Sequence, residues 1–117
     1  MCGRYTIRRR DVLKAAMGGY SLPPSFDFFD ERPRFNVAPS QLSPVVRLNR
    51  AGERTLSQLA WGLVPSWTKG KPKLRPINAK CETAATSAMF KAAMGRRRCL
   101  VPADGFYEWK GAKPPRQ

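Results

Sequence analysis

Two extended runs separated by a short turn constrain the fold of this chain more than any other feature of the sequence. Residues 44–49 and 55–61 are rich in valine and leucine, and the pair Ala51-Gly52 lies between them. Runs of this kind on either side of a glycine-containing turn are typical of a β-hairpin. The sequence therefore predicts an antiparallel strand pair around which the remaining segments have to pack.

Two further segments carry the spacing of helices. The first begins at Asp11, its expected N-cap, and continues to Met17, where Gly18-Gly19 ends it. The second opens at residues 77–83 and is predicted to continue to about Met94. The predicted apolar faces are Val12, Leu13 and Ala16 in the first helix, and Ala85, Ala88, Met89 and Ala92 in the second, which Gly95 terminates.

The other segments predict strands and a loop. Residues 34–41 form a short extended piece that Pro39 ends. Residues 97–102 and 106–110 predict two more strands with a turn between them. Residues 21–33 hold several proline and phenylalanine residues and predict a loop pinned by aromatic side chains.

These elements together predict an α+β fold: a strongly bent, mixed or antiparallel sheet that forms a partial barrel, with short flanking helices. The length of 117 residues suits one domain with a modest core. The aromatic strand at 106–110 has no hairpin partner after it, and an open edge invites pairing with another chain. We therefore expect residues 1–117 to be the N-terminal part of a single longer domain, which would be a monomer when whole.

The charge of the chain predicts a polyanionic partner. Lysine and arginine number 22 against 8 aspartate and glutamate residues, which gives a net charge of +14. This excess favours nucleic acid, although ribosomal and membrane-surface proteins share it. One basic cluster alone is typical of a solvated face, but clusters interleaved with aromatics are typical of a groove that binds single strands. The clusters are Arg8–Arg10, Lys69–Lys73 with Arg75, and Arg96–Arg98, and the aromatics are Trp61, expected in the core, Trp67, expected to be exposed, Tyr107 and Trp109.

Several classes of protein are disfavoured. No apolar run is long enough to span a membrane, and arginines follow the start too soon for a secretory signal. We therefore expect a cytoplasmic, nucleoid-associated protein that does not bind membranes. The three cysteines form no CxxC pair and histidine is absent, so we expect no disulfide framework and no metal site. We also expect no cofactor, because the amine and thiol groups described next can carry the chemistry themselves.

The N-terminal segment carries an unusual nucleophile. Removal of Met1 would leave Cys2 with a free α-amine and a thiol on one residue. The amine can condense with an aldehyde and the thiol can then close a thiazolidine ring, and the thiol alone can also attack a carbonyl. An α-amine has a pKa of about 7.7–8.0, so part of it is neutral near pH 7. The alternative is that Cys2 lies in a frayed terminus or fills a small apolar gap.

Three polar residues near element ends are candidate partners of this nucleophile. Asn78 could simply cap the second helix, but a helix start also favours anions, and Asn78 with Lys80 could hold a phosphate there. Glu108 lies between two aromatic residues, which suits a general acid or base. The alternative for Glu108 is an exposed strand face on which it pairs with Lys110.

Five blocks of the sequence resemble the SRAP family, the SOS response-associated peptidases, whose members sense abasic sites in single-stranded DNA. Each block alone is weak, but all five in this order, with cysteine at position two, are specific. The resemblance covers essentially the whole chain and roughly the first half of the family's domain. The blocks are Cys2–Tyr5, Phe35–Pro39, Trp61–Trp67, Ile77–Thr83 and Cys99–Trp109.

The resemblance implies a function and a set of site residues. Family members lose the initiator methionine, and the exposed cysteine forms a stable thiazolidine with the ring-opened sugar of an abasic site, which gives a DNA–protein crosslink. A protease-like activity is also ascribed to the family. The implied catalytic residues are Cys2 as the nucleophile, Asn78 to position the N-terminal residue or the sugar, and Glu108 as the acid or base. The implied DNA-binding residues are Arg4, Pro39, Trp67 and Lys80.

The sequence departs from the family pattern at two points. Lys80 stands where the family commonly has arginine, so a point charge replaces a bidentate fork and phosphate binding should be weaker. The family's catalytic histidine belongs to its C-terminal half, and the present sequence contains no histidine.

Three functions remain open from the sequence. The first is an abasic-site sensor that forms a covalent Cys2 adduct with single-stranded DNA. The second is a non-catalytic fragment that binds single-stranded DNA, and the third is a cysteine hydrolase acting on peptides. Dependence on Cys2, on the lesion and on salt would distinguish them.

Overall fold

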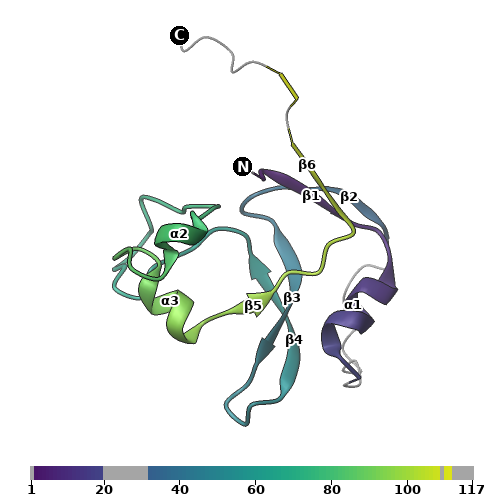
Figure 1. Cartoon of the computed structure of the whole chain (residues 1–117), viewed down its shortest axis with the longest axis horizontal. Coiled ribbons are helices and arrows are strands. Elements are labelled where there is room, and N and C mark those ends of the chain that lie inside the picture. Colours follow the sequence, from purple (N-terminus) through teal and green to yellow (C-terminus); the bar gives the residue numbers. More distant parts are fainter. Residues whose placement is uncertain (1, 20–31, 109, 112–117) are drawn as a thin grey trace.

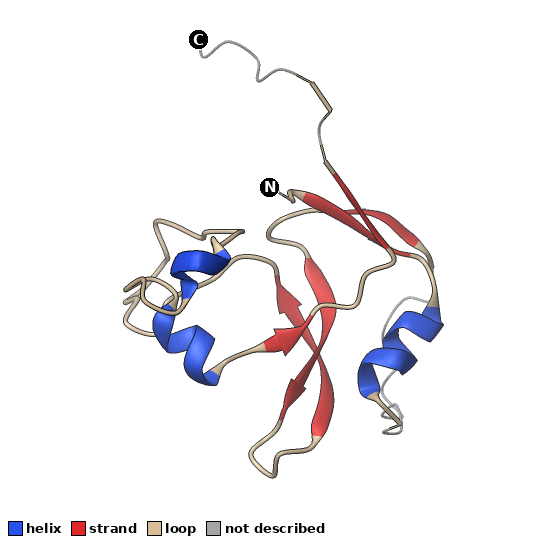
Figure 2. Ribbon diagram, viewed as in Figure 1, coloured by secondary structure: helices blue, strands red, loops and turns tan. Residues whose placement is uncertain are grey.

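The computed structural model describes residues 2–19, 32–108 and 110–111. Figure 2 shows strands in the middle of the molecule and helices at its sides. In chain order the elements are β1 (Arg4–Ile7), α1 (Arg10–Met17), β2 (Arg34–Val37), β3 (Leu42–Leu48), β4 (Arg54–Ala60), α2 (Cys81–Ala84), α3 (Lys91–Arg96), β5 (Cys99–Leu100) and β6 (Gly105–Tyr107).

The strands form two antiparallel sheets. The first has the order β2-β1-β6 and the second the order β4-β3-β5. Every strand pairing within the described residues is antiparallel. The α+β expectation is therefore confirmed. The two sheets do not close into a barrel over these residues, so the partial barrel stays a prediction.

The predicted hairpin is confirmed, and each strand begins and ends one or two residues earlier than the sequence pattern indicates. β3 and β4 pair over their full length, from Leu42 opposite Ala60 to Leu48 opposite Arg54. The side chain of Asn49 organises the turn, because its Oδ1 accepts hydrogen bonds from two backbone N–H groups of the turn at 2.9 and 3.0 Å. The hairpin thus provides a regular frame for the second sheet.

β1 is the central strand of the first sheet, although the sequence pattern does not predict it. It pairs with β2 and β6, which come from distant parts of the chain. Arg4 lies opposite Tyr107, and Thr6 lies opposite Gly105. Figure 1 shows β6 lying along β1 close to the N-terminus. A strand of four residues carries too short a pattern to be recognised without these long-range partners.

The two strands predicted near the end of the chain are shorter than expected and belong to different sheets. β5 occupies only two residues of the predicted segment 97–102. β6 spans Gly105–Tyr107, so it begins one residue before the segment predicted at 106–110 and ends at Tyr107. β5 pairs with β3, whereas β6 pairs with β1. The turn between them therefore connects the two sheets, and the aromatic strand β6 pairs with β1 near the start of the chain.

The segment before the hairpin agrees with its prediction as far as it is described. β2 ends at Val37, ahead of Pro39. The predicted aromatic loop at 21–33 falls, up to residue 31, outside the described residues.

α1 confirms the first predicted helix but not its cap. The helix spans Arg10–Met17 with Arg9 at the N-cap position, and no side chain caps it. The Asp11 carboxylate pairs instead with the guanidinium of Arg9. Leu13 and Met17, four residues apart, are its buried side chains. The helix therefore packs through one narrow stripe.

The prediction of one continuous second helix is wrong. α2 has four residues and α3 has six, and Gly95 lies inside α3 rather than after it. Hydroxyl side chains occupy the interruption and compete for backbone groups, as the 3.3 Å bond from Thr86 Oγ1 to the carbonyl oxygen of Thr83 shows. α2 buries Ala84 and α3 buries none of its residues, so little packing supports a longer helix. No helix in the described part of the chain is long and apolar enough to cross a membrane.

The buried core joins the first sheet to α1 and to the hairpin. A hydrogen bond between the hydroxyls of Tyr5 and Ser43 links the two sheets. Burial raises the pKa of Tyr5, so this hydroxyl stays neutral and available for the bond. The core cluster comprises Tyr5, Ile7, Leu13 and Val37, with Leu56 and Trp61 packed against it.

Candidate functional site

Cys2 is held by one of the side chains that the resemblance pairs with it. The amide Nδ2 of Asn78 donates a hydrogen bond to the backbone carbonyl oxygen of Cys2 at 2.7 Å. Cys2 is half-buried, and its thiol donates to the carbonyl oxygen of Arg4 at 3.4 Å. The structure thus brings Cys2 and Asn78 together, and the chemical roles assigned to them stay predictions.

A closed set of contacts fixes Asn78 relative to β1. The ring of Trp61 lies 5.6 Å from that of Tyr5 between centroids, at an interplanar angle of 59°. Trp61 Nε1 also donates to the carbonyl oxygen of Ile77, directly before Asn78, at 2.9 Å. Asn78 in turn holds Cys2. The N-terminal segment is therefore contacted at two residues, at Tyr5 by Trp61 and at Cys2 by Asn78. Trp61 is half-buried, in agreement with its predicted place against the core.

The loop that carries Asn78 depends on a glycine. Gly62 has a φ of 126°, a backbone conformation that L side chains rarely adopt. The backbone N–H of Leu63, directly after it, donates to the carbonyl oxygen of Pro76 at 2.9 Å. A Cβ on Gly62 would also lie 3.4 Å from the Cβ of Arg75. The short stretch after β4 therefore turns sharply and holds the segment that leads into Asn78.

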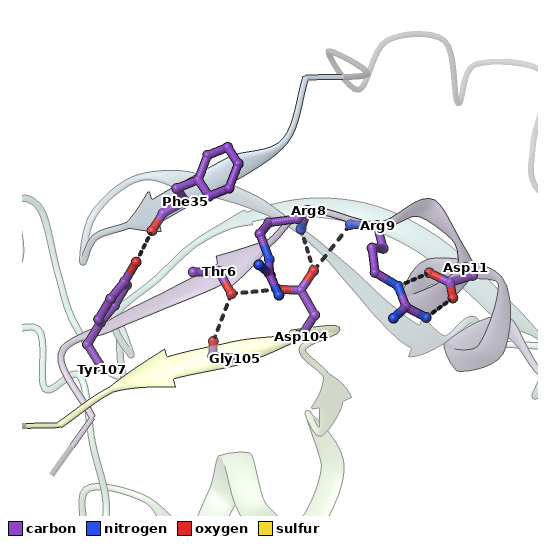
Figure 3. A network of polar contacts seen from close by, with 8 residues as sticks. All are labelled: Thr6, Arg8, Arg9, Asp11, Phe35, Asp104, Gly105 and Tyr107. Atoms are coloured by element: carbon purple, nitrogen blue, oxygen red, sulfur yellow. Dashed lines mark hydrogen bonds and ion pairs between the residues drawn. The ribbon is translucent and has the colours of Figure 1, made fainter.

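β1 and β6 bring a cation and a carboxylate to the same end of the first sheet. Arg4 pairs with Tyr107, which Glu108 follows, and the Arg4 and Glu108 side chains are exposed. Arg4 Nη1 donates to Oδ1 of Asn36 in β2 at 2.9 Å. The Tyr107 hydroxyl donates to the carbonyl oxygen of Phe35 at 2.9 Å (Figure 3). The first bond joins β1 to β2, and the second joins β6 to β2 across β1. Both neighbours of β1, the strand that follows Cys2, are therefore held in place.

Pro39 lies in a tight turn that is tied to the same loop. The backbone N–H of Gln41 donates to the carbonyl oxygen of Ala38 at 3.2 Å, and Ser40 has a φ of 69°. The N–H of Ser40 donates to the carbonyl oxygen of Trp61 at 2.9 Å. Pro39, half-buried, is therefore connected through Trp61 to the site, and its contact with DNA stays a prediction.

Trp67 and Lys80 lie in exposed positions before and after Asn78 in the chain. Trp67 is 56% exposed in the loop between β4 and α2, which agrees with the sequence expectation. Lys80 is exposed at the N-cap position of α2. The helix that begins here is short, since α2 has four residues, and Asn78 contacts Cys2 rather than capping it. Phosphate binding by Asn78 and Lys80 stays a prediction.

The predicted basic clusters differ in what they contact. Arg8 and Arg9 are exposed, but Asp104 and Asp11 pair with them. Lysine and arginine side chains at 69–75 and 96–98 are exposed. Two arginines of the last cluster, with Asn78, line a pocket of about 280 Å³. Its lining residues are Trp61, Gly62, Leu63, Pro76, Ile77, Asn78, Ala79, Ala84, Phe90, Ala93, Met94, Arg97 and Arg98.

Asp104 gathers polar groups from β1 and from the start of α1, as Figure 3 shows. Its carboxylate accepts hydrogen bonds from Thr6 Oγ1 at 2.5 Å and from the backbone N–H groups of Arg8 and Arg9 at 2.6 and 3.2 Å. Arg8 Nε adds a contact at 3.1 Å, and the carboxylate side chain is 7% exposed. Burial on its own would raise the pKa of Asp104, but the bonds from Thr6 and Arg8 outweigh burial and lower it to about 2.

Sequence reasoning does not identify Asn36, Asp104 or the hydroxyl of Tyr107 as supports of the site. Their partners lie 32, 98 and 72 residues away in the sequence, so no local spacing reveals them. The one available signal is that Asp104 stands in the turn before an aromatic strand, where a short acidic side chain can reach backbone N–H groups.

The cysteines other than Cys2 have no part in the contacts described above. Cys81 and Cys99 are free thiols. Burial raises the pKa of Cys99, and the positive charge of Arg47 partly offsets the rise. In the part of the chain that the structure describes, no three His, Cys, Asp or Glu side chains are arranged to hold a metal ion.

Comparison with known proteins finds relatives that are named abasic site processing proteins. The Abasic site processing protein YoqW of Bacillus subtilis (strain 168) is 36% identical over 117 aligned residues, which cover 97% of this chain and 50% of that protein. The Abasic site processing protein HMCES of Pongo abelii is 37% identical over 130 aligned residues, which cover 94% of this chain and 36% of that protein.

A solved structure shares the fold. The crystal structure of a phage-related protein from Bordetella bronchiseptica superposes with a TM-score of 0.73 and 29% sequence identity, over 97% of this chain and 50% of that chain. The chain therefore spans about half the length of these relatives or less. The family model described as SOS response associated peptidase (SRAP) matches residues 1–117, and the chain belongs to that family.

Proposed function

We propose that this chain carries the covalent site of an abasic-site sensor, in which Cys2 captures the lesion in single-stranded DNA. The observation that carries the proposal is the bond from Asn78 to the Cys2 carbonyl oxygen, which fixes the nucleophilic residue at a defined place in the fold. The names of the matched relatives, abasic site processing proteins, support the choice of lesion.

The chemistry follows from the two groups on Cys2. Once Met1 is removed, the α-amine attacks the aldehyde carbon of the ring-opened sugar, and the adduct loses one water to give an imine. The Cys2 sulfur then adds to the imine carbon while its proton passes to nitrogen, which closes a thiazolidine. One C–N and one C–S bond form, the aldehyde oxygen leaves as water, and nothing is oxidised or reduced.

The surrounding residues have separate tasks in this proposal. Asn78 orients Cys2 through its carbonyl oxygen, so that amine and thiol face one aldehyde. Glu108 passes the proton that the departing water requires. Arg4 and Lys80 attract the phosphates, and the exposed ring of Trp67 stacks on a base. Because phosphate contacts release counterions, non-covalent binding should weaken steeply with salt.

Intact-mass measurement tests the proposal. The chain is incubated with a single-stranded oligonucleotide that carries one abasic site, and the expected product has the mass of protein without Met1 plus DNA minus one water. Cys2→Ala should abolish this species. Cys81→Ala removes another exposed thiol and should leave the yield unchanged.

Two results would instead support another class of function. Equal, salt-sensitive affinity for intact and abasic DNA without any adduct would indicate a non-catalytic binding module. Cleavage of a peptide that needs Cys2 but not DNA would indicate a cysteine hydrolase. The first result, obtained with chain that has lost Met1, contradicts the sensing chemistry, and the second contradicts it only if no adduct forms.

A further inference from the structure

We propose that Asp104 is a positioning residue for the reaction of Cys2: it locks β1 against β6 in the one register that sets the nucleophile beside the strand leading to Glu108. The inference rests on the proposed function for its kinetic consequence. Asp104 itself contacts Thr6, Arg8 and Arg9 rather than the reacting atoms. Its effect on the chemistry is therefore exerted through the two strands.

The lock is built from side-chain and backbone bonds at one point. The carboxylate of Asp104 binds the Thr6 hydroxyl and the two backbone N–H groups that follow β1. The backbone N–H of Asp104 donates in the other direction, to the carbonyl oxygen of Thr6, at 3.0 Å. Figure 3 shows Asp104 at the start of β6 facing the β1–α1 junction. The residues at the end of β1 and the residue directly before β6 are thus held together at one end of the strand pair.

Gly105 allows the strands to approach at this point. It lies opposite Thr6, and a Cβ placed on Gly105 would come within 3.1 Å of Thr6 Oγ1. The hydroxyl that binds Asp104 occupies this space. The close approach and the carboxylate therefore specify the same pairing, with Thr6 opposite Gly105 and Arg4 opposite Tyr107.

Register matters because it sets the distance between Cys2 and Glu108. Four positions separate Thr6 from Cys2, and three separate Gly105 from Glu108 on the antiparallel partner. Strand residues advance by about 3.3 Å, so a slip of two residues would displace one group from the other by about 7 Å. A one-residue slip would turn every β1 side chain to the opposite face. Misplacement of about 1 Å already lowers a rate by up to about a hundredfold.

Kinetics of crosslinking test the inference. In Asp104→Asn, a carboxylate oxygen that accepts backbone N–H bonds becomes an N–H donor. We expect the crosslinking rate at saturating DNA to fall between about tenfold and a hundredfold while the half-saturating DNA concentration stays near that of wild type. Asp11→Asn is the matched control, because it removes the same charge from an exposed carboxylate that pairs with Arg9. Its rate should stay near that of wild type.

A second pair of variants keeps the test informative if Asp104→Asn does not fold. Thr6→Val keeps the shape of the side chain and removes the hydroxyl that binds Asp104, so the saturated rate should fall. Thr6→Ser restores the hydroxyl and should restore most of the rate. Equal rates in these two variants, or a loss in Asp104→Asn that appears only as weaker DNA affinity, would overturn the inference.

Hydrogen exchange separates this inference from the proposed function. The backbone amides of β6 should exchange faster in Asp104→Asn than in Asp11→Asn, whether or not DNA is present. If wild type forms no adduct but β6 exchange responds as stated, the proposed function fails and the register lock stands. Unchanged β6 exchange in a folded Asp104→Asn protein contradicts the lock directly.

Discussion

The sheet centred on β1 and the segment that holds α2 and α3 are both built from short elements, but long-range contacts hold them to different extents. β1 buries Tyr5, Thr6 and Ile7 against partners from distant parts of the chain. α3 buries no residue, and α2 buries only Ala84. Burial and long-range bonds, rather than local helix or strand preference, therefore decide which part of this chain is a fixed frame.

Core truncation should separate the two regions most strongly. Leu13→Ala removes a buried side chain that packs against β1 and should lower the free energy of unfolding by about 2–5 kcal/mol. Met94→Ala truncates a side chain in α3 that is 46% exposed and should cost about 0.5 kcal/mol. Urea denaturation monitored by tryptophan fluorescence measures both. Equal losses would mean that α3 belongs to the same frame as β1.

Gly62→Ala should destabilise the loop that carries Asn78. The φ of 126° disfavours any L side chain, so the expected cost is about 1–3 kcal/mol in the free energy of unfolding. The same change should slow Cys2 crosslinking, since Trp61 and Leu63 no longer hold residues 76 and 77 in place. Thermal denaturation and the crosslinking rate check the two effects. A fully stable, fully active variant would show that this loop tolerates another path.

Acid should loosen the β1 frame through Asp104. The folded-state pKa of about 2 lies below the ordinary value of 3.8, so the ionised carboxylate stabilises the fold above pH 3.8 and the contribution is lost as the pH falls toward 2. In Asp104→Asn the dependence of stability on pH between about 4 and 2 should flatten. Asp11→Asn should keep most of it. Urea midpoints at several pH values measure the change, and an unaltered acid limb in Asp104→Asn would argue against the lowered pKa.

Gly95→Ala should have the smallest effect, and the opposite sign. Gly95 lies inside α3, and a Cβ there would meet nothing within 4 Å. Alanine is a better helix former than glycine, so the free energy of unfolding should rise by at most about 1 kcal/mol. Circular dichroism and urea denaturation measure helicity and stability. A loss of stability would show that α3 makes contacts beyond those described.

The sequence correctly predicts the elements in which a local residue pattern coincides with the face that the fold buries. The hairpin is found because its two runs and the turn that Asn49 organises are local. α1 is found because its apolar stripe and the glycines after it coincide. The prediction of a long second helix is wrong because alanine-rich spacing reports helix preference alone. The Thr86 hydroxyl bonds to a backbone carbonyl in the interruption, and little of α2 or α3 is buried. β1 is missed because its partners are distant.

The residues of the candidate site also fall into those that the sequence identifies and those that it does not. Cys2 and Asn78 can be named from their residue types and from the family resemblance, and the structure brings them into contact. The bonds of Asn36, Asp104 and Tyr107 arise from the pairing of β1 with β2 and β6, which no local pattern encodes. Sequence reasoning therefore reaches the reactive groups and leaves out the residues that hold them in place.

Peptide mapping of the DNA adduct identifies the residue that carries the lesion, which the proposed function assigns to Cys2. Trypsin cuts after Arg4, Lys80 and Arg98, so the three cysteines fall on three different peptides. The account predicts that, after nuclease treatment, the sugar remnant is found on the peptide that begins with Cys2. A remnant on the peptide that begins with Cys81 or Cys99, or on a lysine, would contradict it.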